Sequence, residues 1–312
     1  MINMGDLPNL EEYLQQYLEP AIQKGHRVNF GDKWVRLPSY REIKDWDPNL
    51  TVSIVSANWG NTPVLPAHIE GFAKQDYPRD KMEVLFVDDN SPDKNECIDI
   101  MRKLMRKYAD LNIRFFETNK NLNWNSTVST NIGVKKAKGD IIIFCDSDVL
   151  LAGKDYVTAT AKHHSQRTNL WLNPLNYEFT STKVVLDYLA KNFTDIDKEN
   201  FANPIASNLY IVTQPIMWRG GSVRRAEYVK LHGLDEGFKG WGGYEGHLYE
   251  RLKRDGFVGG QDYTMQTLHM WASVFKAQIA EHLFPASGQA TGDLVVNPDG
   301  WGEIETLEEI LV

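Results

Sequence analysis

The sequence has only two cysteines in 312 residues, Cys97 and Cys145, and they fall in a predicted helix and a predicted buried strand. We therefore expect two reduced thiols and no disulfide framework, which favours a cytoplasmic protein. No run of roughly 18 apolar residues is present, so the sequence predicts no transmembrane helix. The first residues lack the basic segment and apolar run of a secretory signal peptide, and we expect none.

The sequence also lacks an excess of positive charge, because its net charge at pH 7 is -8. This charge disfavours a broad nucleic-acid-binding surface, although it is compatible with a local basic groove. Neither an internal repeat nor a low-complexity tract is present. The length is sufficient for a large hydrophobic core, built as one large domain or as two lobes.

Two aspartates follow a strongly apolar segment of the sequence. Residues 141–144 are all apolar, and Asp146 and Asp148, separated by one residue, come shortly after them. A short apolar run of this kind indicates a buried strand, and open α/β sheets bind ligands at the carboxyl ends of their strands. Because alternate residues of an extended chain point the same way, both carboxylates could hold one Mg²⁺ or Mn²⁺ ion. The alternative is a solvated Asp-Ser-Asp turn.

A second acidic strand end lies upstream. Residues 83–87 are apolar after Glu83 and are followed by Asp88 and Asp89, and residues 51–56 form a third predicted strand that ends near Asn58. The alternation of strands with helical segments indicates a parallel α/β sheet, which would place these polar ends at one sheet edge. The alternative interpretation of the second acidic turn is a cap for the helix that follows it.

Several short motifs occur in a characteristic order between about residues 50 and 271. They are Gln75-Asp-Tyr-Pro78, Val87-Asp-Asp-Asn-Ser91, Asn131-Ile-Gly133, Lys138-Gly-Asp140 with the strand and aspartates after it, Arg219-Gly-Gly-Ser222, and Gly233-Leu-Asp-Glu236 with Phe238-Lys-Gly-Trp-Gly-Gly-Tyr-Glu245. In this order and spacing the motifs resemble the family 2 glycosyltransferases of GT-A fold. The resemblance implies a Rossmann-like α/β fold that binds a nucleotide-diphospho-sugar, with a mixed, mainly parallel sheet flanked by helices.

The same motifs suggest four segments. We expect an N-terminal extension over residues 1–50, a nucleotide-sugar-binding half over 51–151, an acceptor-binding and catalytic half over 152–284, and a C-terminal tail over 285–312. The acidic end of the tail is predicted to form a short helix at Glu305 to Leu311.

The resemblance implies roles for the residues at the strand ends. Asp148 would be a direct metal ligand, and Asp146 would lie on the nucleotide-sugar side. Asp88 or Asp89 would hydrogen-bond the base, which is typically uracil, and Asn58 would lie against the nucleoside. The implied cofactor is Mn²⁺ or Mg²⁺, and the implied donor is a UDP-sugar.

Two residues of the second half could join this site. Arg219 precedes a glycine pair and could contact the diphosphate, because a guanidinium matches phosphate oxygens; a salt bridge on the surface is the alternative. His269 lies where several metal-dependent GT-A enzymes place a histidine ligand. A neutral imidazole beside Asp148 would suit Mn²⁺ better than Mg²⁺, and the alternative is a hydrogen-bonded core histidine.

Glu245 is the predicted general base. It follows a glycine-rich segment, residues 240–244, in which the backbone can approach a substrate closely. Related enzymes carry Trp-Gly-Gly-Glu-Asp, where the aspartate removes the acceptor proton, and Glu245 takes its place if the segments align without a gap. Shifted by one residue, Trp-Gly-Gly-x-Glu resembles the retaining galactosyltransferase and polypeptide GalNAc-transferase type. We favour inversion, with Glu245 as the base.

The sequence therefore predicts a metal-dependent glycosyltransferase that moves a sugar from a UDP-sugar to an acceptor hydroxyl. The acceptor is left open between a saccharide, a lipid-linked glycan, a protein and a modified nucleic-acid base. One alternative is a nucleotidyltransferase of related fold, but the Gly-rich, lysine-containing phosphate loop expected there is absent after the first predicted strand. The other is a catalytically inactive carbohydrate-binding homologue, which the departure at Tyr244-Glu245 keeps open.

Overall fold

The computed structural model describes residues 34–120, 122, 126–179, 209–212, 217–238, 244–269 and 297–312. The strands are β1 Trp34–Arg36, β2 Val52–Asn58, β3 Met82–Asp88, β4 Asn112–Glu117, β5 Ile141–Cys145, β6 Val149–Ala152, β7 Leu170–Phe179, β8 Leu209–Val212, β9 Arg219–Arg224, β10 Val258–His269 and β11 Glu308–Ile310. The α-helices are α3 Leu65–Ala73, α4 Lys94–Lys107, α5 Ser126–Lys136, α6 Tyr156–Gln166, α9 Arg225–Lys230 and α10 Tyr244–Arg254. Short 3₁₀ turns are η3 Tyr40–Glu42, η4 Thr62–Val64 and η5 Arg79–Lys81.

Within the described residues all eleven strands belong to one sheet. Its main order is β1-β10-β7-β9-β5-β2-β3-β4-β11, while β6 pairs with β10 and β8 pairs with β7. The strands β5, β2, β3 and β4 run parallel, as do β1, β10 and β7. The antiparallel strand β9 joins these two groups. Because parallel neighbours share a direction, β2, β3, β4 and β5 end at the same sheet edge.

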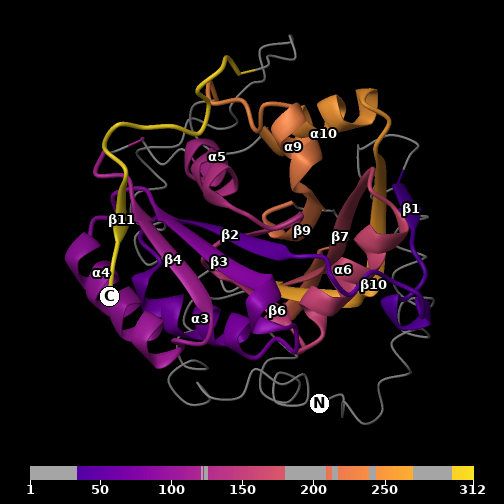
Figure 1. Cartoon of the computed structure of the whole chain (residues 1–312), viewed down its shortest axis with the longest axis horizontal. Coiled ribbons are helices and arrows are strands. Elements are labelled where there is room, and N and C mark those ends of the chain that lie inside the picture. The colour runs from indigo at the N-terminus through magenta and orange to yellow at the C-terminus, as the bar shows by residue number, and fades with distance from the viewer. Residues whose placement is uncertain are drawn as a thin grey trace.

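Helices cover both faces of this sheet, and each face has its own hydrophobic core (Figure 1). One core lies under α3, α4 and α6, and the other lies under α5, α9 and α10. Gly133 allows α5 to approach β2 closely, since a Cβ there would overlap a methyl group of Val55. The predicted mixed, mainly parallel sheet with flanking helices is confirmed.

The sequence patterns of the central elements explain why they form. The strands β3 and β5 are buried along their whole length and consist mostly of apolar residues, as expected for strands covered on both faces. Helix α4 buries Cys97, Met101 and Leu104, which recur at intervals of four and three residues and so share one helix face. Ile98, Ile100 and Met105 of α4 pack partly buried against the same core, and the other positions are charged or polar.

The two ends of the described chain both add strands to the sheet. β1 pairs with β10 at one edge, and β11 pairs antiparallel with β4 at the other. The predicted helix at Glu305 to Leu311 is therefore wrong. The free edge of β4 offers backbone hydrogen bonds, and Arg114 on that strand binds both carboxylate oxygens of Glu309 at 2.9 and 3.1 Å. Neither interaction with β4 is visible in the local sequence of the tail.

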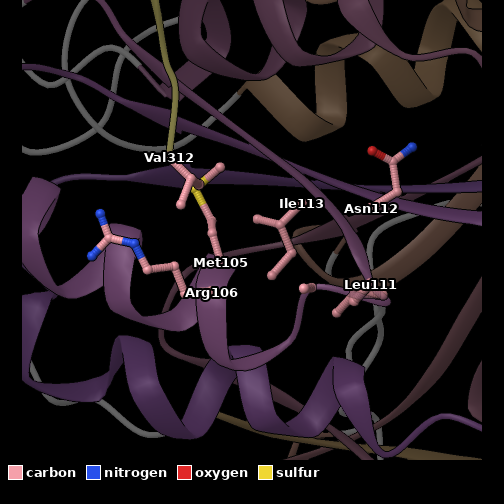
Figure 2. A pocket seen from close by; sticks show the side chains of 7 residues that line it. Met105, Arg106, Leu111, Asn112, Ile113 and Val312 are labelled. Carbon is pink, nitrogen blue, oxygen red and sulfur yellow. The ribbon is translucent and has the colours of Figure 1, made fainter.

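A hollow of about 450 Å³ lies where α4 ends and β4 begins (Figure 2). Its lining comes from Met105, Arg106, Ala109, Leu111, Asn112, Ile113 and Val312. Since Asn112 starts β4, the hollow is at the amino ends of the parallel strands and away from the acidic strand ends. In the part of the chain that the structure describes, no helix combines the length and the apolar character that a membrane span requires.

Candidate active site

The two aspartates of the predicted metal site lie in a tight turn between β5 and β6. The amide of Val149 donates to the carbonyl of Asp146 at 2.9 Å and closes this turn, while the amide of Asp146 donates to the carbonyl of Trp218 at 2.8 Å. Asp148 is only 2% exposed, whereas Asp146 is partly exposed. The alternative interpretation, a solvated Asp-Ser-Asp turn, therefore does not hold for Asp148.

Strand pairing brings two distant residues to this turn. In the antiparallel pair of β5 with β9, Cys145 lies opposite Arg219, and in the pair of β6 with β10, Val149 lies opposite His269. The Nε2 atom of His269 is 3.4 Å from Oδ1 of Asp148. The structure thus places the predicted histidine and aspartate ligands in contact.

Glycine at position 220 allows the backbone next to Arg219 to adopt its conformation. Gly220 has a φ of +92°, which favours glycine, and a Cβ there would overlap the hydroxyl of Tyr156. That hydroxyl donates a hydrogen bond of 2.8 Å to the Gly220 carbonyl, and the hydroxyl of Thr267 donates one of 3.0 Å to the Arg219 carbonyl. These contacts fix the backbone from which the guanidinium extends.

Glu245 lies in the first turn of α10 and its carboxylate is held by backbone amides. Its Oε1 atom accepts hydrogen bonds from the amides of Met217 at 2.7 Å and Trp218 at 3.4 Å. Desolvation raises the pKa of Glu245 to about 7, although the two amides and Arg219 oppose this shift. The residue as a whole is half-buried. A carboxylate with a pKa near neutrality suits general-base chemistry.

The charges of these residues act on one another. Burial lowers the pKa of the Arg219 guanidinium, and the negative charges of Asp146, Asp148 and Glu245 oppose that shift. We call Asp146, Asp148, Arg219, Glu245 and His269 the charged cluster. All five were predicted from the sequence as site residues, and the structure brings them together. Their individual roles stay predictions, and residues 239–243 of the glycine-rich segment lie outside the described part of the chain.

A second polar group lies where β2 and β3 end. The Asp88 carboxylate is fully buried and accepts hydrogen bonds from the Ser91 amide at 2.8 Å, from the Ser91 hydroxyl at 2.6 Å and from the Asn58 side-chain amide. The amide of Asp89 donates to the Asn58 carbonyl at 2.9 Å, and its carboxylate accepts from the Leu122 amide at 3.0 Å. The structure therefore groups the three residues predicted to hold the nucleoside.

One carboxylate of this second group was missed in the sequence. Glu117 ends β4, lies opposite Asp88 in the strand register and is fully buried. Burial, followed by the charge of Asp88, raises the pKa of Glu117 to about 7, and Lys94 lies 3.6 Å away. An acidic residue at the end of an apolar strand is the signal that pointed to Asp88, and it could have identified Glu117. We call Asn58, Asp88, Asp89, Ser91 and Glu117 the turn cluster.

The residues present suit a divalent metal that is shared with a substrate. Asp148 and His269 offer one oxygen and one nitrogen ligand, a pair that suits Mn²⁺. Across the described residues, no group of three or more His, Cys, Asp or Glu side chains could hold a metal ion. An ion bound by this pair would need further ligands, which at phosphate sites are usually water and substrate oxygens.

The sequence from 53 to 228, more than half of the chain, matches the family model for glycosyl transferase family 2. The chain belongs to glycosyl transferase family 2. The predicted family is confirmed. This family 2 glycosyltransferase is 28% identical over 116 residues to the poly(ribitol-phosphate) beta-N-acetylglucosaminyltransferase TarS of Staphylococcus aureus. The match covers 36% of this chain and 19% of TarS, so the chain spans about a fifth of the length of that relative.

Two solved structures resemble this family 2 glycosyltransferase in fold. The mannosyltransferase PcManGT from Pyrobaculum calidifontis, in complex with GDP-Man and Mn²⁺, matches with a TM-score of 0.52 and 15% identity over 83% of this chain and 66% of its own. GalNAc-T7 with UDP, GalNAc and Mn²⁺ matches with a TM-score of 0.51 and 14% identity over 72% and 44%. At these identities the likeness concerns the fold alone, and the predicted GT-A fold is confirmed.

Proposed function

We propose that this glycosyltransferase moves a sugar from a UDP-sugar to an acceptor hydroxyl in a metal-dependent, inverting reaction. The observation that carries the proposal is the carboxylate of Glu245, which has a pKa of about 7 and lies in the field of Arg219 within the charged cluster. The solved relatives support the donor and the metal, because GalNAc-T7 was solved with UDP and both structures hold Mn²⁺. TarS is itself named as an N-acetylglucosaminyltransferase.

Glu245 acts as the base in this reaction. Its carboxylate takes the proton of the acceptor hydroxyl while the acceptor oxygen forms a bond to the anomeric carbon of the donor. The bond from that carbon to the diphosphate breaks, and the UDP leaves with the electron pair. Attack on the face opposite the leaving group inverts the anomeric configuration.

The negative charge of the leaving diphosphate must be stabilised by positive groups in a site from which water is partly excluded. Arg219 supplies a partly buried guanidinium whose planar donors match phosphate oxygens. A divalent ion held by Asp148 and His269 would supply further stabilisation of the leaving group as a Lewis acid. Asp146, which is partly exposed, would face the sugar or its diphosphate.

The turn cluster divides between structure and binding. Asp88 is engaged by Ser91 and Asn58, so we assign it to the shape of the turn. Asp89 is held through its own amide and that of Leu122, and we assign contact with the uracil base to Asp89. Asn58 would support the nucleoside from the end of β2.

The acceptor and the compartment complete the proposal. We propose a saccharide or polyol hydroxyl as the acceptor, in keeping with the poly(ribitol-phosphate) in the name of TarS. Both cysteines are buried free thiols, in α4 and β5, which supports a reducing compartment such as the cytoplasm.

Calorimetric titration with UDP tests the donor and metal parts of the proposal together. We expect the protein to bind UDP with Mn²⁺ present and to lose most of that affinity with a chelator. Asp148→Ala should remove the metal-dependent part and leave the fold intact. Asp99→Ala, a change at an exposed aspartate of α4, serves as the matched control and should bind as the parent does. Equal affinity of parent and Asp148→Ala, with and without chelator, would refute the metal site.

A second measurement addresses the donor sugar. A panel of UDP- and GDP-sugars is incubated with the protein and Mn²⁺, and release of the nucleotide is followed. Faster release from one or more UDP-sugars supports the proposal, whereas a preference for GDP-sugars would contradict the uracil assignment.

A further inference from the structure

A fully buried histidine lies next to the turn that carries the two aspartates. His68 is on α3, and its ring meets that of Phe72 edge-on with a centroid separation of 4.5 Å. Its Nδ1 atom lies 2.6 Å from the carbonyl oxygen of Val149, and its Nε2 atom lies 2.9 Å from the hydroxyl of Ser56. The ring therefore connects β2 to the first residue of β6.

The direction of these two hydrogen bonds follows from their chemistry. A carbonyl oxygen can only accept, so the Nδ1 atom of His68 carries the proton and donates it to Val149. Burial lowers the pKa of His68 to about 4, so the ring is neutral at pH 7 and Nε2 is an acceptor. The hydroxyl of Ser56 then donates to Nε2. Both ring nitrogens are bonded, and the side chain adds no unpaired charge to the core.

The other residues of the same turn are tied to further elements. The side-chain amide of Asn61, just before η4, donates to the hydroxyl of Ser147 at 2.8 Å, and both residues are buried. The amide of Asp146 is bonded to Trp218 before β9, and the amide of Val149 closes the turn on Asp146. The turn is thus bonded to three separate parts of the fold through protein groups alone.

We propose that His68 is a positioning residue that, together with Asn61, holds the Asp146–Asp148 turn in its ligand-binding shape before metal or nucleotide arrives. Without the imidazole, the carbonyl of Val149 would lose its side-chain donor at 2.6 Å, and the thiol of Cys145, 3.6 Å away, is a much weaker donor. A turn left loose in this way must become ordered when the metal binds, and that ordering weakens affinity.

The turn can be tested in protein that holds no metal. Hydrogen–deuterium exchange of peptides covering residues 144–152 reports the order of the turn, and peptides covering α10, which packs on the other core, serve as the reference. His68→Leu removes both hydrogen bonds and puts an apolar side chain in place of the imidazole. We expect faster exchange at the turn and unchanged exchange in α10. His68→Asn, whose amide nitrogen can take the place of Nδ1, should restore most of the protection.

Metal affinity gives the second readout. Binding of Mn²⁺ in the presence of UDP, followed by electron paramagnetic resonance, should weaken roughly 10–100-fold in His68→Leu, the range typical of groups that orient metal ligands. We expect His68→Asn to lie near the parent. Asn61→Ala, which detaches the turn through Ser147, should shift both readouts in the same direction as His68→Leu.

The outcomes separate this inference from the proposed function. Its consequence for metal affinity rests on that function, whereas the order of the metal-free turn does not. If the parent protein binds no Mn²⁺, the proposed metal site is refuted, and hydrogen exchange still tests whether His68 orders the turn. Parental exchange and affinity in His68→Leu would refute the inference. Faster exchange throughout the protein, without rescue by His68→Asn, would also refute it and show that His68 serves the core as a whole. Should His68→Leu not fold, His68→Asn and Asn61→Ala decide on the same two readouts.

Discussion

The charged cluster and the turn cluster lie at the same edge of one sheet but are built in different ways. The charged cluster draws its residues from the β5–β6 turn, β9, α10 and β10, which are far apart in the sequence. Most of the turn cluster lies within and just after β2 and β3, and short hydrogen bonds connect its members. The first cluster depends on the register of distant strands, and the second depends on local turn geometry.

This difference indicates a division of labour. In the turn cluster a single carboxylate, Asp88, accepts hydrogen bonds from Ser91, from Asn58 and, more weakly, from the thiol of Cys97, so its loss should mainly affect folding. In the charged cluster, carboxylates, an arginine and a histidine surround a place where charge would develop during sugar transfer. Substitutions there should mainly affect binding and turnover, since perturbed ionisable groups concentrate at functional sites.

The strongest test of this division is Glu245→Gln. The amide keeps the size of the side chain but cannot take the acceptor proton, so turnover should fall by roughly 10²–10⁴-fold while donor binding stays near the parent value. In the parent, turnover should rise with pH through about 7 as the carboxylate ionises, and this dependence should vanish in the variant. Steady-state kinetics and calorimetry give the two quantities.

Two observations sharpen this first prediction. Glu250→Gln, at an outward-facing glutamate of the same helix that pairs with Lys253, is the matched control and should leave turnover unchanged. The anomeric proton of the product, observed by NMR, should show a configuration opposite to that of the donor. A retained configuration would exclude the simple base role of Glu245.

The second prediction concerns His269, the member of the charged cluster that lies furthest from the two aspartates in the sequence. If His269 binds the metal with Asp148, His269→Ala should weaken Mn²⁺ affinity by roughly 10–100-fold or more, at least the loss found for residues that only orient metal ligands. The Mn²⁺ titration is paired with a thermal melt. If the variant keeps its Mn²⁺ affinity but melts at a lower temperature, His269 is a structural residue of the core and does not belong to the metal site.

The third prediction concerns Asp88 of the turn cluster, whose replacement should lower stability. Asp88→Ala removes the side-chain acceptor of the Ser91 amide and one acceptor of the Asn58 side chain, which should lower the free energy of unfolding by about 1–3 kcal/mol. Urea unfolding should show a lower midpoint with an unchanged m-value. Asp146→Ala, at the partly exposed aspartate of the charged cluster, should unfold like the parent. Equal destabilisation by both changes would remove the distinction between the clusters.

The smallest effect should appear in the pH dependence of stability. Burial beside Asp88 raises the pKa of Glu117 from 4.5 to about 7, so the folded protein keeps a proton that the unfolded chain loses between these values. This contribution is fully present below pH 4.5 and is lost as pH rises towards 7. Urea unfolding at several pH values should therefore show a shallower decline in Glu117→Gln than in the parent. An identical decline in both proteins would assign the slope to other groups, of which Glu245 has the same sign.

Some features of the chain could be predicted because they depend on local patterns. The fully apolar run before Cys145 predicts a strand buried on both faces, and the structure has one there. The acidic residues after it and at the end of β3 lie at one edge because parallel strands share a direction. Both cysteines occupy the buried positions expected for reduced thiols. In each case the residue and its neighbours in sequence contain the information.

The tail shows where local patterns fail. Its acidic end suggested a helix, but Glu309 meets Arg114 on β4, and the segment joins the sheet as β11. The preference of a short polar segment is weak, so a free strand edge and one charged pair are enough to decide its conformation.

By itself, then, the sequence determined the α/β class, the acidic strand ends and the family order of the motifs, since these depend on side-chain periodicity and on residue types at fixed spacings. The tertiary structure decided which of these residues meet. The antiparallel pairings of β5 with β9 and β6 with β10 set Arg219 and His269 beside the aspartate turn, and the packing of α3 puts His68 against Val149. Strand register and helix packing are products of the whole buried core, so no local stretch of sequence contains them.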